Sequence, residues 1–374
     1  MTDGVTDAAN SYRNHYTNNN HSLQMASTIN LSPLQIMPSV MARWQRESQD
    51  YQRGMLDTAA VRHTLLINPS LRATLKLSKT VSFELNYAFS TSKPSILQTL
   101  GYRDLTDPLF ITEGNPMLKD THSHNVKLSY NMVLARSQTS LSASIEYRAN
   151  DRDRVTALGY NPTTAVYVSR PENVRGSRTW EFRLDIDQAL GELFHLDNEF
   201  RLNTGQNYGY LTLLPTQAER TLNRQSNFHP KDRLTLSLDK NWLKASVFAK
   251  IEANRLRFSA SPEQNTTLWN NNYGLQAEAT VGQFVFETDL TDYTRRGYAT
   301  QSMNRNMLLW NAAVTWKILK NKARLKLEYE DILNKQDNFW SNQSAYQRTT
   351  SWDDFRHHYV NITFTYHLDA KKKD

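Results

Sequence analysis

Histidine and acidic side chains are the groups in this 374-residue sequence that could support metal or acid–base chemistry. His122 and His124 stand two residues apart, which places both on one face of a strand and is acceptable metal-ligand spacing. No third ligand accompanies them in the sequence, while His357 and His358 would point to opposite faces of a strand. The acid-rich segments lack the pattern of a calcium loop. The sequence therefore predicts neither a metal site nor a cofactor.

Motifs for bond-making chemistry are also missing from the sequence. The chain has no cysteine, which excludes zinc–thiolate clusters, thiol nucleophiles and disulfides. It contains no Gly-rich phosphate loop, nucleophile elbow or spaced pair of catalytic carboxylates. We therefore expect a binding or structural protein and not an enzyme.

Aromatic and arginine residues in the predicted loops are the candidates for ligand binding. Amphipathic side chains of this kind on loops suit the capture of a polar ligand. They equally suit the packing of one loop against another. The candidates are Tyr102, Arg103, Tyr208, Tyr210, Trp269, Arg295, Arg296, Trp340 and Trp352.

The overall composition limits the classes of protein to which the chain can belong. It has 44 Lys and Arg against 37 Asp and Glu, a net charge of +7 that is dispersed along the sequence, so we predict no nucleic-acid partner. No stretch of about 18 apolar residues is present, so no transmembrane helix is expected. The first residues lack the basic and apolar regions of a signal peptide. Membrane strands remain possible, because alternation hides their apolar face from an average over the sequence.

Alternation of apolar and polar residues recurs through the sequence, whereas helical spacing is nearly absent. In "VSFELNYAF" the apolar face carries Val81, Phe83 and Leu85, and the closing "YVNITFTYHL" repeats the pattern with Val360 and Ile362. By this count the chain has about fifteen strands, most of about 8 to 12 residues, and a tilted strand needs about 9 to 11 to cross a bilayer.

The predicted connections alternate strictly between short and long. Short turns are expected at 31–35, 77–80, 135–140, 188–193, 239–242, 281–284 and 317–323, and long loops at 46–61, 90–121, 150–177, 203–230, 252–272, 291–306 and 334–355. All long loops then lie at one end of the sheet, as in outer-membrane barrels. A Greek-key sandwich has no reason to keep this order. The sequence therefore predicts an all-β, antiparallel, up-and-down transmembrane β-barrel.

Strand direction sets the expected domain organisation. If the last strand descends to the periplasm, the first predicted strand, from about Ser22, also descends, and residues 1–21 read as an extracellular loop. Residues 22–368 form the barrel domain and 369–374 a C-terminal tail. Because single-chain bacterial barrels normally have an even number of strands, an odd count predicts an incomplete barrel. We expect the C-terminal part of a larger, 22-stranded barrel.

Three motifs, in the same order along the chain, resemble the barrels of TonB-dependent outer-membrane receptors. The segment "TEGNPMLKD" resembles their Gly-Asn-Pro-x-Leu strand entrance, although Lys119 and Asp120 replace the usual Pro-Glu. "LKLEYEDILNK" resembles the exit of their penultimate strand, and the last strand resembles the one read by the barrel-assembly machinery. The matching positions are Gly114, Asn115, Pro116, Leu118, Asp331, Leu333, Asn334 and Tyr366.

The resemblance implies an outer-membrane transporter that binds a scarce solute through extracellular loops. Its implied partners are outer-membrane lipid, the barrel-assembly machinery, a small-molecule, glycan or siderophore ligand, and the TonB energy complex. The last would act through a plug domain, which this sequence lacks. Two alternatives stay open: an outer-membrane barrel with a structural, secretory or adhesive role, and a soluble β-rich binding domain.

Overall fold

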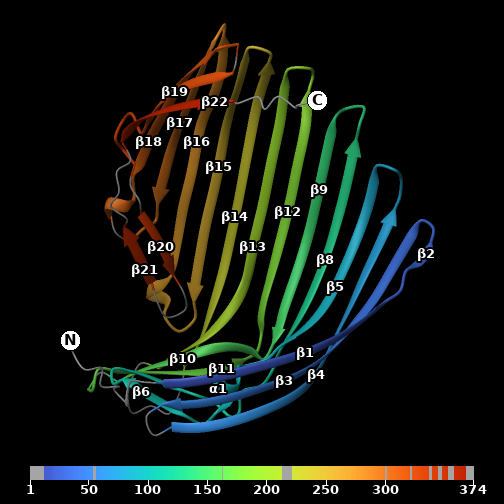
Figure 1. Ribbon diagram of the computed structural model, residues 1–374, viewed down its shortest axis with the longest axis vertical. Helices are drawn as coiled ribbons and strands as arrows, with labels where there is room; N and C mark the ends of the chain where they lie inside the picture. Colours follow the sequence, from blue (N-terminus) through green and yellow to red (C-terminus); the bar gives the residue numbers. More distant parts are fainter. Residues whose placement is uncertain are drawn as a thin grey trace, which may run out of the picture.

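The computed structural model describes residues 12–53, 56–161, 163–212, 221–299, 301–320, 322–336, 339–343, 348–352 and 358–367. Within these ranges the chain is almost entirely β-strand. Consecutive long strands pair antiparallel with their neighbours in the sequence, which gives one curved up-and-down sheet (Figure 1). No helix in the described part of the chain is long and apolar enough to cross a membrane.

Twenty strands pair in the sheet over the described residues, and fifteen of them form the up-and-down series, as many as the sequence predicts. They are β1 (Tyr12–Ala26), β3 (Leu34–Arg53), β4 (Leu56–Lys76), β5 (Val81–Ser92), β8 (Thr121–Leu134), β9 (Thr139–Asp151), β12 (Ser177–Leu190), β13 (Phe194–Thr212), β14 (Thr221–Lys240), β15 (Leu243–Phe258), β16 (Thr266–Val281), β17 (Phe284–Arg296), β18 (Asn306–Ile318), β19 (Ala323–Glu330) and β22 (Tyr359–Tyr366).

The remaining elements lie in the connections between these strands. They are β2 (Ile29–Leu31), α1 (Ile96–Thr99), β6 (Arg103–Asp107), β7 (Phe110–Glu113), β10 (Asp153–Asn161), β11 (Val166–Val174), β20 (Phe339–Gln343), β21 (Arg348–Trp352) and two single turns of 3₁₀-helix, Pro262–Gln264 and Gln301–Met303. Two of these connections join each other, because β11 pairs in parallel with β7 and β10 pairs in parallel with β13. The segments after β5 and after β9 therefore form one structured layer at the long-loop end of the sheet (Figure 1).

The two faces of the sheet differ in chemistry. Large apolar side chains stand exposed on one of them, including Trp44, Leu234 (45% exposed) and Ile362 (68% exposed). Strand alternation places charged and polar residues on the opposite face. Buried apolar residues form only a two-residue cluster of Leu256 and Phe258 within the described part. We call these surfaces the apolar face and the polar face. A sheet with this division has its apolar surface outside, as a lipid-facing barrel does.

The seven predicted short turns agree with the structure, but several predicted loop boundaries are wrong. The predicted loop at 46–61 is mostly strand, since β3 runs to Arg53 and β4 starts at Leu56. The loop at 203–230 shortens in the same way, and β1 begins at Tyr12, about ten residues before the predicted strand. These extensions lack alternation: β3 is mostly polar on both faces after Arg46, and β4 begins with the unpatterned run from Leu56 to Val61. Backbone pairing continues through them, as between Tyr12 and Arg53.

The two ends of the sheet are separate. Over the described residues β1 pairs in the sheet with β3 and β22 pairs with β19, and the two strands lie apart in Figure 1. On β22 the predicted apolar residues share a face with β19, because Ile362 lies opposite Leu327 and Phe364 opposite Leu325. Leu368 and the predicted tail, 369–374, lie outside the described residues.

Candidate functional site

The ligand-binding residues predicted from the sequence lie on separate elements. Trp269 on β16 faces Arg296 on β17, and the next pair in the ladder contains Arg295. The Arg296 guanidinium Nη2 donates to Asn306 Oδ1 at 2.7 Å. These three candidates are therefore brought together at the long-loop end of two adjacent strands.

The remaining candidates are spread over other connections. The Tyr102 ring packs 6.4 Å from the Tyr51 ring, and Arg103 forms an ion pair with Glu113 at 3.3 Å. Tyr208 and Tyr210 both lie on β13, some distance along the chain from Trp352 on the β20–β21 hairpin. Trp340 occupies a strand position on β20, and its side chain lies outside the described part.

The Gly-Asn-Pro element joins the connection after β5 to the β10–β11 hairpin. Asn115 is 1% exposed, and its Nδ2 donates to the Pro171 carbonyl at 2.8 Å and to Glu172 at 3.1 Å. Its Oδ1 accepts from Met117 N–H and from Arg170. A side-chain amide that satisfies both donors and both lone pairs while buried is a strong cross-link between segments.

The rest of that element shapes the backbone around the cross-link. Gly114 allows close approach, because a Cβ there would fall 1.8 Å from the Leu100 carbonyl oxygen. Pro116 follows in the same turn, and Leu118 is buried and donates its N–H to the Asn115 carbonyl at 3.0 Å. The motif residues therefore hold two loops together.

The second motif organises the exit from β19. Asp331 is 1% exposed, and its carboxylate accepts the backbone N–H groups of Lys335 at 2.9 Å and Gln336 at 2.8 Å. Asn334 returns its N–H to the Asp331 carbonyl at 2.8 Å. Leu333 is partly exposed in this turn, and Tyr366 pairs with Ala323 at the end of β22. These positions fold the connection that follows β19.

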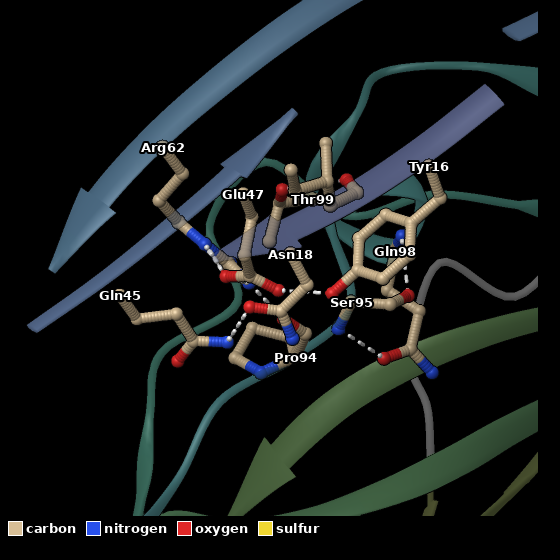
Figure 2. Close-up of polar contacts among 10 residues, drawn as sticks. Tyr16, Asn18, Gln45, Glu47, Arg62, Pro94, Ser95, Gln98 and Thr99 are labelled. Atoms are coloured by element: carbon tan, nitrogen blue, oxygen red, sulfur yellow. Dashed lines mark hydrogen bonds and ion pairs between the residues drawn. The ribbon is translucent and has the colours of Figure 1, made fainter. Parts of the chain in front are cut away.

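A buried ion pair at the long-loop end was not predicted from the sequence. Glu47 on β3 is 5% exposed, and its carboxylate accepts from Arg62 Nε at 2.9 Å, Arg62 Nη2 at 2.7 Å and the Tyr16 hydroxyl at 2.7 Å. Arg62 Nη2 also donates to the Pro94 carbonyl at 2.8 Å. Figure 2 shows Tyr16 from β1 and Arg62 from β4 meeting at Glu47 on β3, with Pro94 of the segment before α1 beside Arg62.

The connection after β5 covers this ion pair. Ser95 and Gln98 form a capping box at the start of α1, with N–H to side-chain distances of 3.3 and 3.1 Å, and Pro94 just before them is fully buried (Figure 2). A cavity of about 500 Å³ lies between this segment and the polar faces of β3 and β4. The basic side chains on its wall are Arg43, Arg62, Lys93 and Arg154.

Glu47 lies beyond the apolar belt of β3. Trp44 is the last large apolar residue on that strand's apolar face, and Arg46, Ser48 and Asp50 follow it there. Burial acts to raise the pKa of the Glu47 carboxyl, but hydrogen bonds from Tyr16 and Arg62 outweigh it and lower the pKa below its ordinary value of 4.5. Glu47 is therefore a carboxylate at neutral pH.

The surroundings of Lys93 disfavour its charged form, whereas those of Glu47 favour the carboxylate. Burial is the main reason that the pKa of Lys93 is lowered, and the charge of Arg62 adds to that effect, while Asp120 and Glu47 oppose it. Its Nζ is buried without a hydrogen-bond partner among the described residues. A second cavity, of about 540 Å³, lies near the short-turn end and has acidic walls that include Glu278, Glu287 and Glu328. The walls of these two cavities thus differ in charge, mainly basic in the first and mainly acidic in the second.

The pattern that could have revealed the Glu47 pair was present in the sequence. Gln45, Glu47 and Gln49 alternate with Trp44, Arg46 and Ser48, which places the first three on the polar face. Extending the strand prediction past residue 46 would have set Glu47 opposite Arg62, its partner in the β3–β4 ladder. The boundary error in the predicted loop hid it.

Comparison with known families agrees with this architecture. A family model described as the outer membrane protein beta-barrel family matches residues 48–366. The chain belongs to that family. It is accordingly an outer-membrane protein, and the apolar face of its strands meets lipid.

Comparison with solved structures adds distant similarities. The FrpB iron transporter from Neisseria meningitidis (F3-3 variant) is similar at 8% sequence identity and a TM-score of 0.36. The match covers 93% of this chain and 64% of that transporter, so the chain spans less than two thirds of its length. No curated protein matches the chain.

Proposed function

We propose that this chain is the barrel part of a TonB-dependent receptor-like transporter, which binds a scarce solute at its loop end and imports it. The observation that carries the proposal is the position of the connection after β5. This segment folds onto the polar face and borders an open cavity against β3 and β4. Long connections lie on the extracellular side of outer-membrane barrels, so the cavity lies where an external solute would first enter.

The loop-end contacts support a binding role. Asn115 and the Glu47–Arg62 pair are buried and hydrogen-bonded, which fixes the connection and preorganises the cavity wall. Fixed polar groups around a concave surface are typical of small-molecule sites. The chemistry would be binding followed by a gated conformational change, and the TonB complex would supply energy through a plug domain in the lumen.

Uptake by intact cells tests this function. A strain without the gene is complemented with the wild-type gene or with an empty vector. Both are incubated with a defined mixture of citrate, ferric citrate, glucose 6-phosphate and uncharged sugars, and loss of each solute from the medium is followed by mass spectrometry. We expect faster loss of at least one solute in the complemented strain, and a protonophore should remove the difference.

Equal depletion by the two strains would contradict import. Depletion that survives the protonophore would identify a passive pore and contradict energy coupling. Immunoblotting of outer-membrane fractions, with and without boiling, confirms that the folded barrel is present in the complemented strain.

A further inference from the structure

The cavity under the connection after β5 has an excess of positive charge. Arg43, Arg62, Lys93 and Arg154 line it, and Glu47 is the one carboxylate among its lining residues. Its wall therefore carries four positive charges and one negative charge when Lys93 is protonated. We propose that this cavity binds an oxyanion, the carboxylate or phosphate group of a small solute.

Lys93 is the group that most needs such a ligand. Its Nζ is buried and has no hydrogen-bond partner among the described residues. The charge of Asp120 acts to raise the pKa of Lys93, but the two side chains form no ion pair among the described residues. Leaving an ammonium group buried and unpaired is costly, and an oxyanion would supply both the opposite charge and the missing acceptor.

Arg154 provides a second unsatisfied donor on the same wall. It comes from β10, and its Nη1 is buried without a partner in the described part of the chain. Its Nη2 reaches Ser92 Oγ only at 3.5 Å. Lys93 and Arg154, from different connections, thus both line one cavity, and each keeps a nitrogen without a partner in the described part. An oxyanion that accepts from both would join the segments after β5 and β9.

The Glu47–Arg62 pair supports this site without occupying it. Glu47 holds Arg62 through two N–H contacts, and Arg62 in turn holds the Pro94 carbonyl beside Lys93. Because the cavity lies on the polar face, opposite the lipid-facing side of β3 and β4, its ligand comes from the aqueous lumen side. The expected ligand is a dissolved anion and not a lipid headgroup.

This inference deepens the proposed import function by naming the chemistry of its solute. The two remain separable by experiment. Anion binding to the purified protein tests the cavity alone, whereas depletion by cells tests import. Binding without uptake would leave the anion site standing and remove the transport role, and uptake of uncharged solutes alone would do the reverse.

Isothermal titration calorimetry of the full chain in detergent micelles tests the site. Citrate and glucose 6-phosphate are the probes for carboxylate and phosphate, and glucose and the trimethyl ester of citrate are their uncharged counterparts. We expect at least one anion to bind while both neutral compounds do not. Lys93→Gln should weaken that binding about tenfold, the scale of one charge-assisted hydrogen bond, and Lys93→Arg should largely retain it.

Lys79→Gln is the matched control, because it removes the same charge from the exposed turn between β4 and β5 at the other end of the sheet. Its affinity should equal that of the wild type. Equal affinities for Lys93→Gln and wild type would overturn the inference, as would the absence of anion binding to the wild type. The unboiled migration of each variant in detergent gels verifies that it is folded.

Discussion

At the residue scale, the polar groups buried at the loop end divide into satisfied and unsatisfied ones. Glu47, Asn115 and Asp331 each have several partners, and all three hold segments in place. Lys93 and Arg154 each retain a buried nitrogen without a partner in the described part. The first group is explained by folding alone, whereas the second calls for a ligand.

Replacement of Glu47 should destabilise the loop end in a pH-dependent manner. Glu47→Gln removes the charge that Arg62 faces, and losing hydrogen bonds between charged groups in this part-buried pair costs about 2 kcal/mol. Because folding lowers the pKa of Glu47, the stabilisation is present above the ordinary value of 4.5 and is lost as pH falls through the lower folded value. We therefore expect wild type and variant to differ in thermal unfolding temperature at pH 7, and the difference to shrink in acid below pH 4.5.

Glu84→Gln is a control for that measurement, because Glu84 is more exposed and its closest basic atom, Arg72 Nε, is 3.8 Å away. Its unfolding temperature at pH 7 should stay close to that of the wild type, since exposed pairs contribute little. A difference between wild type and Glu47→Gln that is constant from pH 7 to pH 3 would contradict the assignment.

At the element scale, the alternation pattern predicted the strands well where one face is apolar. It located all seven short turns, and it put Phe83 on the apolar face of its strand, where the structure sets its ring 4.9 Å from that of Tyr130. It failed above the apolar belt, where β3 continues to Arg53 with mostly polar residues on both faces and β4 begins at Leu56 without alternation. There, strand structure is imposed by backbone pairing with a neighbour, which one strand's sequence does not reveal.

The candidate site was hidden for a related reason. Its parts come from β3, β4 and two separate connections, so their proximity depends on contacts across many residues. Arg154 and Ser92, for example, meet across a sequence separation of 62. Resemblance identified the Gly-Asn-Pro motif. Its role in joining two loops follows only from the structure, in which Asn115 bonds to the β11 backbone.

The Asn115 cross-link between the connection after β5 and the β10–β11 hairpin should be sensitive to a single methyl group at Gly114. Gly114→Ala places a Cβ 1.8 Å from the Leu100 carbonyl oxygen, which forces the backbone to move and costs about 2 kcal/mol. We expect faster hydrogen exchange in the connection after β5 and in the β10–β11 hairpin, with the exchange of β14 and β15 unchanged.

Gly101→Ala is the matched control in the same connection. A Cβ there would meet Pro116 Cγ at 3.5 Å, an ordinary contact. Its exchange pattern should follow the wild type. If Gly114→Ala and Gly101→Ala have the same hydrogen-exchange rates, the close backbone approach at Gly114 does not stabilise the Asn115 cross-link.

At the scale of the whole molecule, the apolar face defines which substitutions the membrane tolerates. Leu234 lies on the apolar face of β14, and Leu234→Arg should destabilise the folded barrel by about 2–4 kcal/mol, the cost of an arginine facing the bilayer core. Ser237→Arg introduces the same side chain on the polar face of that strand, beside the acidic cavity, and should be tolerated.

Urea titration of the protein in lipid vesicles, followed by heat-modifiable migration, measures both variants. A shift of the midpoint to lower urea for Leu234→Arg alone is the expected result. Equal midpoints for the two variants would contradict the assignment of the lipid-facing side.

The fifteen-strand, up-and-down order has a geometric consequence for assembly. Because directions alternate, β1 and β22 run the same way, so their direct pairing would be a parallel ladder, unlike the antiparallel pairs between neighbouring long strands in the described sheet. A two-fold axis would make two β1 edges antiparallel, but it would also turn one copy upside down in the bilayer. Two copies inserted in the same orientation therefore cannot complete each other by antiparallel pairing at these edges. Antiparallel closure of this sheet into a cylinder would need an odd number of further strands between the two edges.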